Sequence, residues 1–267
     1  MKGSGQRLAE SLEDTRRDLV DHIVAVINAA EEIGEPFHHL QFQDLFPEDL
    51  YDDLQAVMPS SGDYRPMSGR SKTRDSLRIK MDLLPEHIRH LPRPKRRLWS
   101  MVGQALCSQE VGDAFRRKLA PGLWDRFGEH AKTMRFYPIP ILTRDVPGYQ
   151  IGVHPDTHWK GMTIQIYLPN DASIADVGTL FHSGSKALGF QKEKQIPFLP
   201  NSGYAFAVGQ STYHSVDPVG EHVVTRDSIL LTYFVDQSIL QMLRNRFKRL
   251  GNLVLAEFKA LARGVAA

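Results

Sequence analysis

The sequence has very little cysteine. Cys107 is the single cysteine among 267 residues, so no disulfide can form within the chain, and thiolates alone cannot build a zinc site. A small secreted domain held together by disulfides is therefore excluded. We expect the protein to work in a reducing compartment, the cytoplasm.

Long hydrophobic runs and an excess of one charge are also lacking. No stretch reaches the roughly 18 apolar residues of a transmembrane helix, and residues 1–21 lack the apolar segment of a signal peptide. Lys and Arg total 33 against 31 Asp and Glu, a formal net charge of +2. So small a charge gives no argument for a nucleic-acid partner. We expect neither a membrane span nor bound nucleic acid.

Residues 1–132 read as a mostly helical region. Apolar residues at helical spacing predict a helix from about residue 18 that ends at Gly34. Pro47, followed by two acidic residues, predicts the start of a second helix. A third helix is expected over residues 95–119.

Residues 133–236 differ from residues 1–132 in their residue pattern, which predicts strands. Runs of β-branched and aromatic residues at 163–168, 203–208 and 228–235 are separated by turn residues, which is typical of a β-sandwich, jelly roll or barrel. Over residues 237–267 apolar residues recur every three or four positions. This spacing predicts an amphipathic C-terminal helix that packs on its own domain or forms a homodimer with a second copy. The fold class is therefore α+β, with the three regions forming one integrated catalytic domain.

The segment His154-Pro155-Asp156 carries the clearest chemical signal. Alternation along an extended backbone places the His154 and Asp156 side chains on one face. His214 follows a later predicted strand. Two imidazoles and one carboxylate form the facial triad of non-haem Fe(II), which leaves positions open for a co-substrate and O₂. Arg226, at the start of the last apolar strand, can pair with a carboxylate near the metal.

This order of residues resembles the signature of the prolyl-hydroxylase-like 2-oxoglutarate/Fe(II) oxygenases, whose core is a double-stranded β-helix of the jelly-roll or cupin-like kind. The resemblance covers residues 133–236 and extends more loosely over 36–132. It implies that His154, Asp156 and His214 bind iron and that Arg226 holds the distal carboxylate of 2-oxoglutarate. Further matches lie at Tyr167, Tyr137, Gly178-Thr179-Leu180 and Pro200-Asn201-Ser202-Gly203.

The two matching tyrosines have different implied roles. Tyr167 corresponds to a tyrosine that donates a hydrogen bond to the distal carboxylate, and Tyr137 corresponds to a tyrosine of the co-substrate pocket. The chain departs from the family pattern at Val177, where a glycine is usual, and at Thr232, where a bulky residue is common. Both departures concern the shape of the substrate pocket, where we also expect Gln165, His182, Tyr149 and Thr232.

The resemblance implies an enzyme that hydroxylates an unactivated C–H bond of a small molecule, using Fe(II), 2-oxoglutarate and O₂ and releasing succinate and CO₂. Asp156 favours hydroxylation, because halogenating relatives have a small residue at that place. The basic stretch between Arg65 and Arg97 is either a solvated face or a collar that favours an anionic substrate. The residues suggested for this collar are Arg65, Arg70, Lys72, Arg74 and Arg78.

Three other functions remain open at this stage. A cupin-like module could hold a metal as a sensor without turnover, a cupin-like barrel could catalyse an isomerase or lyase reaction without O₂, and a hydroxylase could act on a protein side chain. His158, two residues after Asp156, offers an alternative ligand in a reversed Asp-x-His motif.

Overall fold

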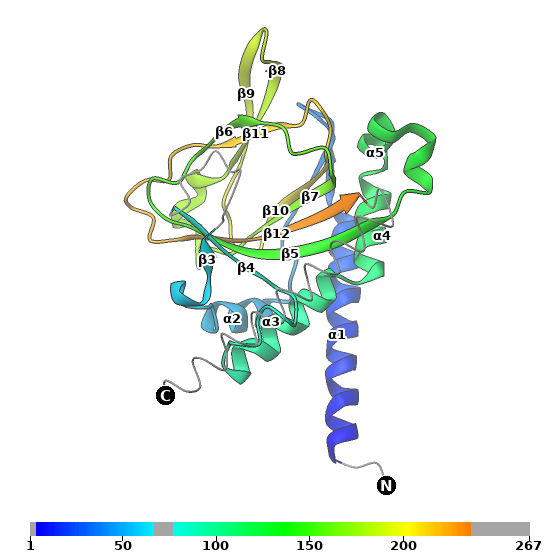
Figure 1. Ribbon diagram of the computed structural model, residues 1–267, viewed down its shortest axis with the longest axis vertical. Helices are drawn as coiled ribbons and strands as arrows, with labels where there is room; N and C mark the ends of the chain where they lie inside the picture. Colours follow the sequence, from blue (N-terminus) through cyan, green and yellow to red (C-terminus); the bar gives the residue numbers. More distant parts are fainter. Residues whose placement is uncertain (1–3, 67–76, 236–267) are drawn as a thin grey trace.

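The structure is a computed structural model that describes residues 4–66 and 77–235, with side chains from residue 13 onward (Figure 1). The amphipathic helix predicted over 237–267, and the homodimer expected from it, lie outside the described residues. So do Arg70, Lys72 and Arg74 of the basic stretch. Among the described helices, none is both long enough and apolar enough to cross a membrane.

The helices of the described chain precede most of the strands. They are α1 (Ser4–Ala29), α2 (Glu48–Ala56), α3 (Arg93–Leu106), α4 (Gln109–Lys118) and α5 (Ala120–Phe127), with short 3₁₀ turns η1 (Ser61–Asp63), η2 (Gly128–Lys132) and η3 (Ala172–Val177). Helix α2 begins directly after Pro47, as the sequence predicts.

Two predicted helix boundaries are wrong. Helix α1 ends at Ala29 instead of Gly34, because Glu31–Ile33 forms a strand that pairs with a second strand at His39–Phe42. The helix expected over 95–119 is two helices, since Ser108 interrupts it. The Ser108 hydroxyl accepts a hydrogen bond from the Val111 amide at 3.3 Å and so caps a new helix.

The strands form two antiparallel sheets. The large sheet has the order β1-β2-β10-β7-β12-β5-β4-β3, and the small sheet has the order β6-β11-β8-β9. The strands of the large sheet are β1 (Glu31–Ile33), β2 (His39–Phe42), β3 (Arg65–Pro66), β4 (Arg78–Asp82), β5 (Phe136–Asp145), β7 (Lys160–Tyr167), β10 (Gly203–Ala207) and β12 (Arg226–Val235). Those of the small sheet are β6 (Ile151–His154), β8 (Thr179–Ser185), β9 (Gly189–Ile196) and β11 (Tyr213–Val216).

The predicted strands at 163–168, 203–208 and 228–235 are confirmed as β7, β10 and β12, which lie at the centre of the large sheet. Strands β1 to β4 come from the region that was expected to be mostly helical. They complete both edges of the large sheet, where β2 and β4 pair with strands that are far away in the sequence.

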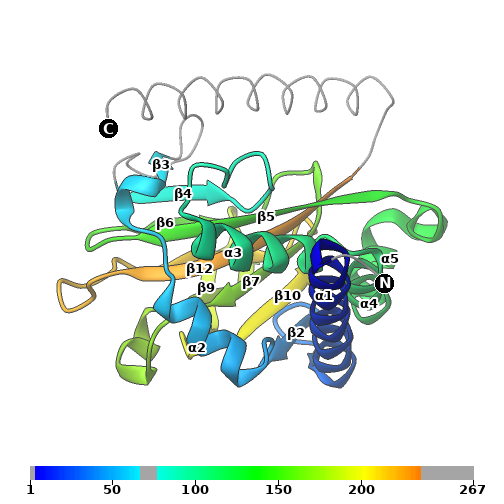
Figure 2. The same ribbon diagram turned by 90° about the horizontal axis from the view of Figure 1, so that it is seen from below.

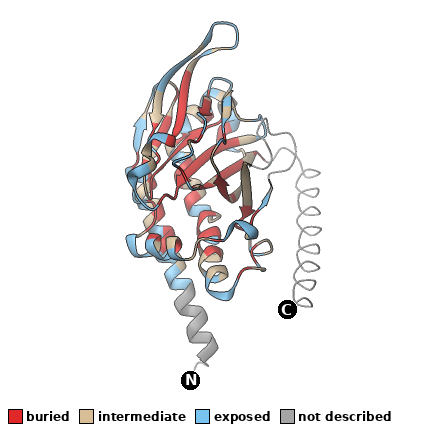
Figure 3. Ribbon diagram, turned by 90° about the vertical axis from the view of Figure 1, so that its left-hand side faces the viewer, coloured by how far each residue is buried: buried red, intermediate tan, exposed pale blue. Residues whose placement is uncertain are grey.

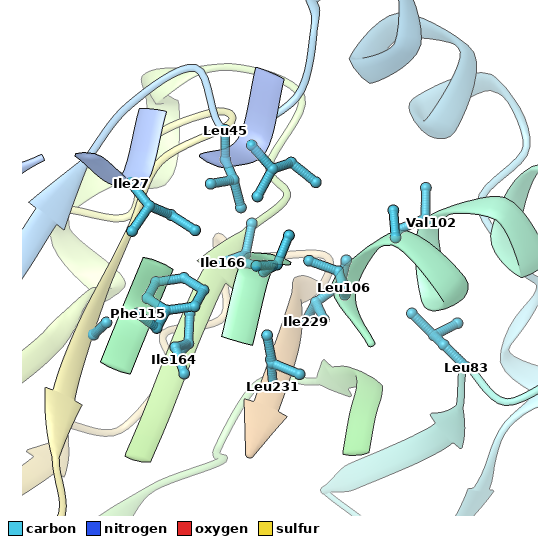
Figure 4. Packing of buried hydrophobic residues seen from close by; sticks show 14 of the residues in the cluster. Ile27, Leu45, Leu83, Val102, Leu106, Phe115, Ile164, Ile166, Ile229 and Leu231 are labelled. Atoms are coloured by element: carbon cyan, nitrogen blue, oxygen red, sulfur yellow. The ribbon is translucent and has the colours of Figure 1, made fainter. Parts of the chain in front are cut away.

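One face of the large sheet packs against helices. Ile164 and Ile166 of β7 and Ile229 and Leu231 of β12 join residues of α1, α3 and α4 in one buried apolar cluster (Figure 4). Figure 2 shows α1 and α3 on this side of the sheet. The alternation of side chains along each strand sends the intervening residues to the opposite face.

The opposite face of the large sheet looks toward the small sheet. A second cluster joins Tyr167, Tyr204 and Phe206 of the large sheet to Phe181 and Val216 of the small sheet. The hairpin of β8 and β9 continues beyond this cluster into solvent, where its tip is exposed (Figure 3). The space between the two sheets is therefore where the predicted site residues converge.

A glycine before β8 allows the two strands of this hairpin to approach closely. A Cβ atom on Gly178 would lie 1.7 Å from the carbonyl oxygen of Ile196. The Gly178→Ala variant is expected to lose about 2 to 3 kcal/mol of unfolding free energy, because backbone must move to relieve the clash. Chemical denaturation measures this loss.

Gly34→Ala is the matched control, since nothing lies within 4 Å of a Cβ at that position. This change should alter stability by no more than about 1 kcal/mol. Equal stability of the two variants would contradict the close approach.

Candidate metal centre

Two histidines meet across neighbouring strands of the small sheet. His154 is the last residue of β6, and the antiparallel register pairs it directly with His214 of β11. Their ring centroids lie 4.4 Å apart. Asp156 follows β6 by two residues, and one ligand atom from each of the three side chains lies within 4.8 Å of the others. The structure thus brings together the three residues expected to bind iron.

The backbone sets the tautomer of both histidines. Nδ1 of His154 lies 2.9 Å from the carbonyl oxygen of Gly152, and Nδ1 of His214 lies 3.1 Å from that of Thr212. A carbonyl only accepts, so each Nδ1 carries the proton and each Nε2 carries the lone pair that a metal needs. Burial lowers the pKa of His214 to about 4, which keeps that imidazole neutral near pH 7.

The Asp156 carboxylate is held on both oxygens. Lys160 Nζ donates to Oδ1 at 2.6 Å, and the Thr163 hydroxyl donates to Oδ2 at 2.6 Å. Burial by itself raises the pKa of Asp156, but the charge of Lys160, the nearby His214 and the two hydrogen bonds lower it well below the ordinary value. The carboxylate is therefore ionised and oriented.

Arg126 of α5 anchors the loop after Asp156. Its Nη1 donates to the carbonyl oxygens of Lys160 at 2.5 Å and Val208 at 2.6 Å, and its Nη2 donates to that of His158. The His158 side chain is exposed, packs against Trp159 and is not in the triad cluster. Sequence reasoning missed Arg126, because its partners are backbone carbonyls that leave no trace in the sequence.

Arg226 lies buried at the start of β12, with 1% of its surface exposed. Its Nε donates to the carbonyl oxygen of Val177 at 2.7 Å, and its Nη1 donates to Asp145 Oδ2 at 2.9 Å. The guanidinium carbon lies 5.6 Å from the ring centroid of Tyr167 and 4.7 Å from that of Phe198. The predicted neighbours Arg226 and Tyr167 are thus brought together.

Two phenols converge on one threonine beside Arg226. The hydroxyls of Tyr167 and Tyr204 donate to Thr179 Oγ1 at 2.9 and 3.2 Å. Burial raises the pKa of both tyrosines, so both stay protonated. The Tyr204 ring contacts that of Tyr167 and stacks on Phe206, whose ring centroid lies 5.3 Å from that of His214. Thr179 could be found in the sequence because it follows Gly178 in a segment that matches the family. No sequence feature pointed to Tyr204 as a site residue.

Gln165 and Thr232 lie on the same face of the large sheet as this cluster. Gln165 Nε2 donates to the Ser228 hydroxyl at 2.5 Å, and Thr232 is directly opposite Thr163, the residue bonded to Asp156. Both side chains are buried. They therefore line the interior between Arg226 and the triad.

The other two predicted tyrosines lie at different ends of this face. Tyr149 is buried beneath the guanidinium of Arg78, and its hydroxyl has no hydrogen-bond partner among the described residues. Tyr137 stacks on Phe234 with ring centroids 5.4 Å apart. Phe234 pairs with Lys160, so Tyr137 lies toward the metal end of the sheet.

The expectation that His182 points into the pocket is wrong. In the register of β8 and β11, Phe181 pairs with His214, whereas His182 pairs with Tyr213. Successive residues of a strand face opposite sides. The His182 ring accordingly lies on the other face of the small sheet, where its Nε2 is 2.8 Å from the Ser215 hydroxyl.

Two arginines of the suggested collar are paired with carboxylates inside the protein. Arg65 bonds to Asp82, and Arg78 bonds to Asp145. A groove of about 1810 Å³ lies among α1, α2 and α3, on the helical side of the large sheet, and no triad residue lines it. The chemistry-bearing side chains therefore lie between the sheets and not in this groove.

Comparison with known proteins gives a result at the level of the fold. No protein-family model matches the chain, and no curated protein matches it. Solved structures of prolyl hydroxylases, however, superpose on it over most of its length. The chain therefore has the fold of the prolyl hydroxylases.

Two such structures have TM-scores of 0.50. A prolyl-4-hydroxylase from Pseudomonas putida is 15% identical, and the match covers 79% of this chain and 98% of that one. A prolyl hydroxylase from Trichoplax adhaerens, solved with a peptide fragment of the hypoxia inducible factor oxygen degradation domain, is 12% identical. That match covers 88% of this chain and 94% of the other.

The Thr163 hydroxyl orients Asp156, so its removal should weaken metal binding without unfolding the protein. We expect Thr163→Val to lower Mn(II) affinity about tenfold, the usual effect of losing a hydrogen bond to a metal ligand. Titration calorimetry with Mn(II) measures the change. Thr133→Val, at an exposed threonine, is the control and should bind Mn(II) as the parent does. Unchanged Mn(II) affinity in Thr163→Val would show that metal binding by Asp156 does not require the hydrogen bond from Thr163.

Proposed function

We propose that the protein is a non-haem Fe(II) and 2-oxoglutarate-dependent dioxygenase that hydroxylates a C–H bond of a small molecule. The observation that carries this proposal is the placement of two sites between the same two sheets. One is the His154–Asp156–His214 cluster, and the other is the buried guanidinium of Arg226. On this proposal the two facing antiparallel sheets form a double-stranded β-helix.

The donor set of the triad fits Fe(II). Two imidazoles present Nε2, because their Nδ1 protons are engaged by backbone carbonyls, and one carboxylate is held ionised by Lys160 and Thr163. Nitrogen and oxygen ligands in this ratio suit a non-haem iron site with open positions. His154, Asp156 and His214 would hold the metal on this reading. Asp156 also occupies the place that a halide would need, which favours hydroxylation.

The surroundings of Arg226 fit a carboxylate at the other end of the co-substrate. Its guanidinium is oriented by Val177 and Asp145, and the ring of Tyr167, whose hydroxyl donates to Thr179, lies beside it. The orphaned Tyr149 hydroxyl adds a buried polar atom whose hydrogen-bonding capacity is not met by described residues. An anionic ligand would satisfy such a group.

Iron with 2-oxoglutarate and O₂ supplies the oxidising power when bound, and succinate and CO₂ leave as products. The chain contributes positioning and exclusion of water. Gln165 and Thr232 lie between Arg226 and the triad and would shape the space beside the metal. We place this activity in the cytoplasm, where the single cysteine and an Fe(II) centre are both kept reduced.

The triad variants His214→Ala and Asp156→Ala test the proposal directly. Each removes one of three metal ligands, so we expect Mn(II) affinity to fall by at least about 100-fold. Succinate formation with Fe(II), 2-oxoglutarate and O₂ should be lost as well. His222→Ala is the control, because this exposed histidine lies outside the triad and should leave both readouts unchanged.

Three results would contradict the proposal in whole or in part. Retention of full metal affinity in both triad variants would remove the metal site. Tight 2-oxoglutarate binding with no succinate formed, across a library of metabolites and peptides, would instead favour a metal-holding sensor. Substrate-dependent succinate formation with peptides alone would replace the small molecule by a protein side chain.

A further inference from the structure

A row of three buried charges crosses the large sheet at the Arg226 end. The register pairs Asp145 of β5 with Arg78 of β4 on one side and with Arg226 of β12 on the other. Residues directly opposite each other in antiparallel strands share a face and lie within reach of one another. The fold therefore fixes an arginine–aspartate–arginine row beside the proposed 2-oxoglutarate site.

Asp145 binds both arginines at once. The Nε and Nη2 atoms of Arg78 donate to the two carboxylate oxygens, with Nη2 at 2.7 Å, and Nη1 of Arg226 donates to Oδ2 at 2.9 Å. The Asp145 side chain is fully buried, and 14% of the Arg78 side chain is exposed. The two hydrogen bonds to Asp145 leave the Arg78 guanidinium little freedom. The hydrogen bond from Arg226 to Asp145 helps to orient the Arg226 guanidinium.

The row carries an uncompensated positive charge. If Asp145 paired with Arg226 alone, the two charges would cancel and no net attraction for a carboxylate would remain. Arg78 restores a net charge of +1. The neighbouring buried pair of Arg144 and Asp227 is neutral and does not change this balance. Because an unpaired buried charge is costly, a ligand with one negative charge at this end would stabilise the row.

Tyr149 supplies a second, independent observation, a buried polar atom beside Arg78. The guanidinium of Arg78 lies 4.1 Å from the centroid of its ring, and the buried hydroxyl has no partner among the described residues. A buried hydroxyl without a hydrogen bond is unfavourable, so a polar ligand is expected beside it.

We propose that Arg78 and Asp145 are positioning residues that make the site select a 2-oxo acid with a distal carboxylate. Asp145 orients the guanidinium of Arg226, and Arg78 offsets the charge of Asp145 so that Arg226 can attract the carboxylate. This inference rests on the proposed function. It assigns the basic residue Arg78 to the co-substrate, whereas the sequence had suggested a role in binding an anionic substrate.

Calorimetry on the full-length, Mn(II)-loaded protein compares two ligands. One is 2-oxoglutarate, and the other is 2-oxopentanoate, which has a methyl group in place of the distal carboxylate. We expect Arg78→Gln to bind 2-oxoglutarate about tenfold more weakly, the scale of one charge-assisted contact, and to bind 2-oxopentanoate as the parent does. In turnover assays the KM for 2-oxoglutarate should rise while kcat at saturation is retained.

Two further variants separate charge from structure. Arg78→Lys keeps the charge and should retain most of the 2-oxoglutarate affinity. Arg78→Gln combined with Asp145→Asn returns the row to a net charge of +1, so this double variant should bind 2-oxoglutarate more tightly than Arg78→Gln alone. Arg117→Gln, at an exposed arginine of α4, controls for loss of a positive charge elsewhere.

The outcomes distinguish this inference from the function on which it rests. Equal weakening for both ligands in Arg78→Gln, or no recovery in the double variant, would mean a structural role for Arg78 and overturn the inference. Unchanged 2-oxoglutarate affinity in Arg78→Gln would do the same, while leaving the proposed function intact. Failure of the parent protein to bind 2-oxoglutarate in the presence of Mn(II) would overturn both.

Discussion

The alternation of side chains in the large sheet is the constraint on which the remaining architecture depends. Along β7 and β12, every second residue is apolar and packs against the helices, as Ile164 and Leu231 do. The residues between them, such as Thr163 and Arg226, must then face the small sheet. A shift of one residue in the pairing would exchange the two sets. The apolar core thus fixes the register, and the register places the polar site.

The interior of this site contains buried polar and charged groups that hydrogen-bond to one another. Thr179 receives hydrogen bonds from two tyrosines, and Asp145 receives them from two arginines. Such buried networks are favourable only when each member is paired. Among the described residues, the Tyr149 hydroxyl lacks a partner, as does the Tyr64 hydroxyl beside Arg144. The structure therefore resembles a binding site more than a core that is complete in itself.

The two ends of the site differ in how they are built. The metal end is assembled largely from short-range features, because His154 and Asp156 are two residues apart and each histidine bonds to a carbonyl two residues before it, although strand pairing brings His214 to His154. The Arg226 end is assembled from strands that are distant in sequence, since β4, β5 and β12 each contribute one charge. The first kind of arrangement leaves a motif, and the second does not.

This difference explains how far the amino-acid sequence alone could lead. The pairing of His154 with Asp156 and the central strands were predictable from local spacing and periodicity, whereas His214 and Arg226 were expected from the order of residues in the family that the sequence resembles. The break at Ser108, the strand at Glu31–Ile33 and the outward face of His182 were not, since a helix cap and the pairing of strands override a periodic pattern. The same holds for Arg78 and Asp145. Their contact exists only because β4 and β5 pair across more than sixty intervening residues, where strand register and not sequence spacing determines the neighbours.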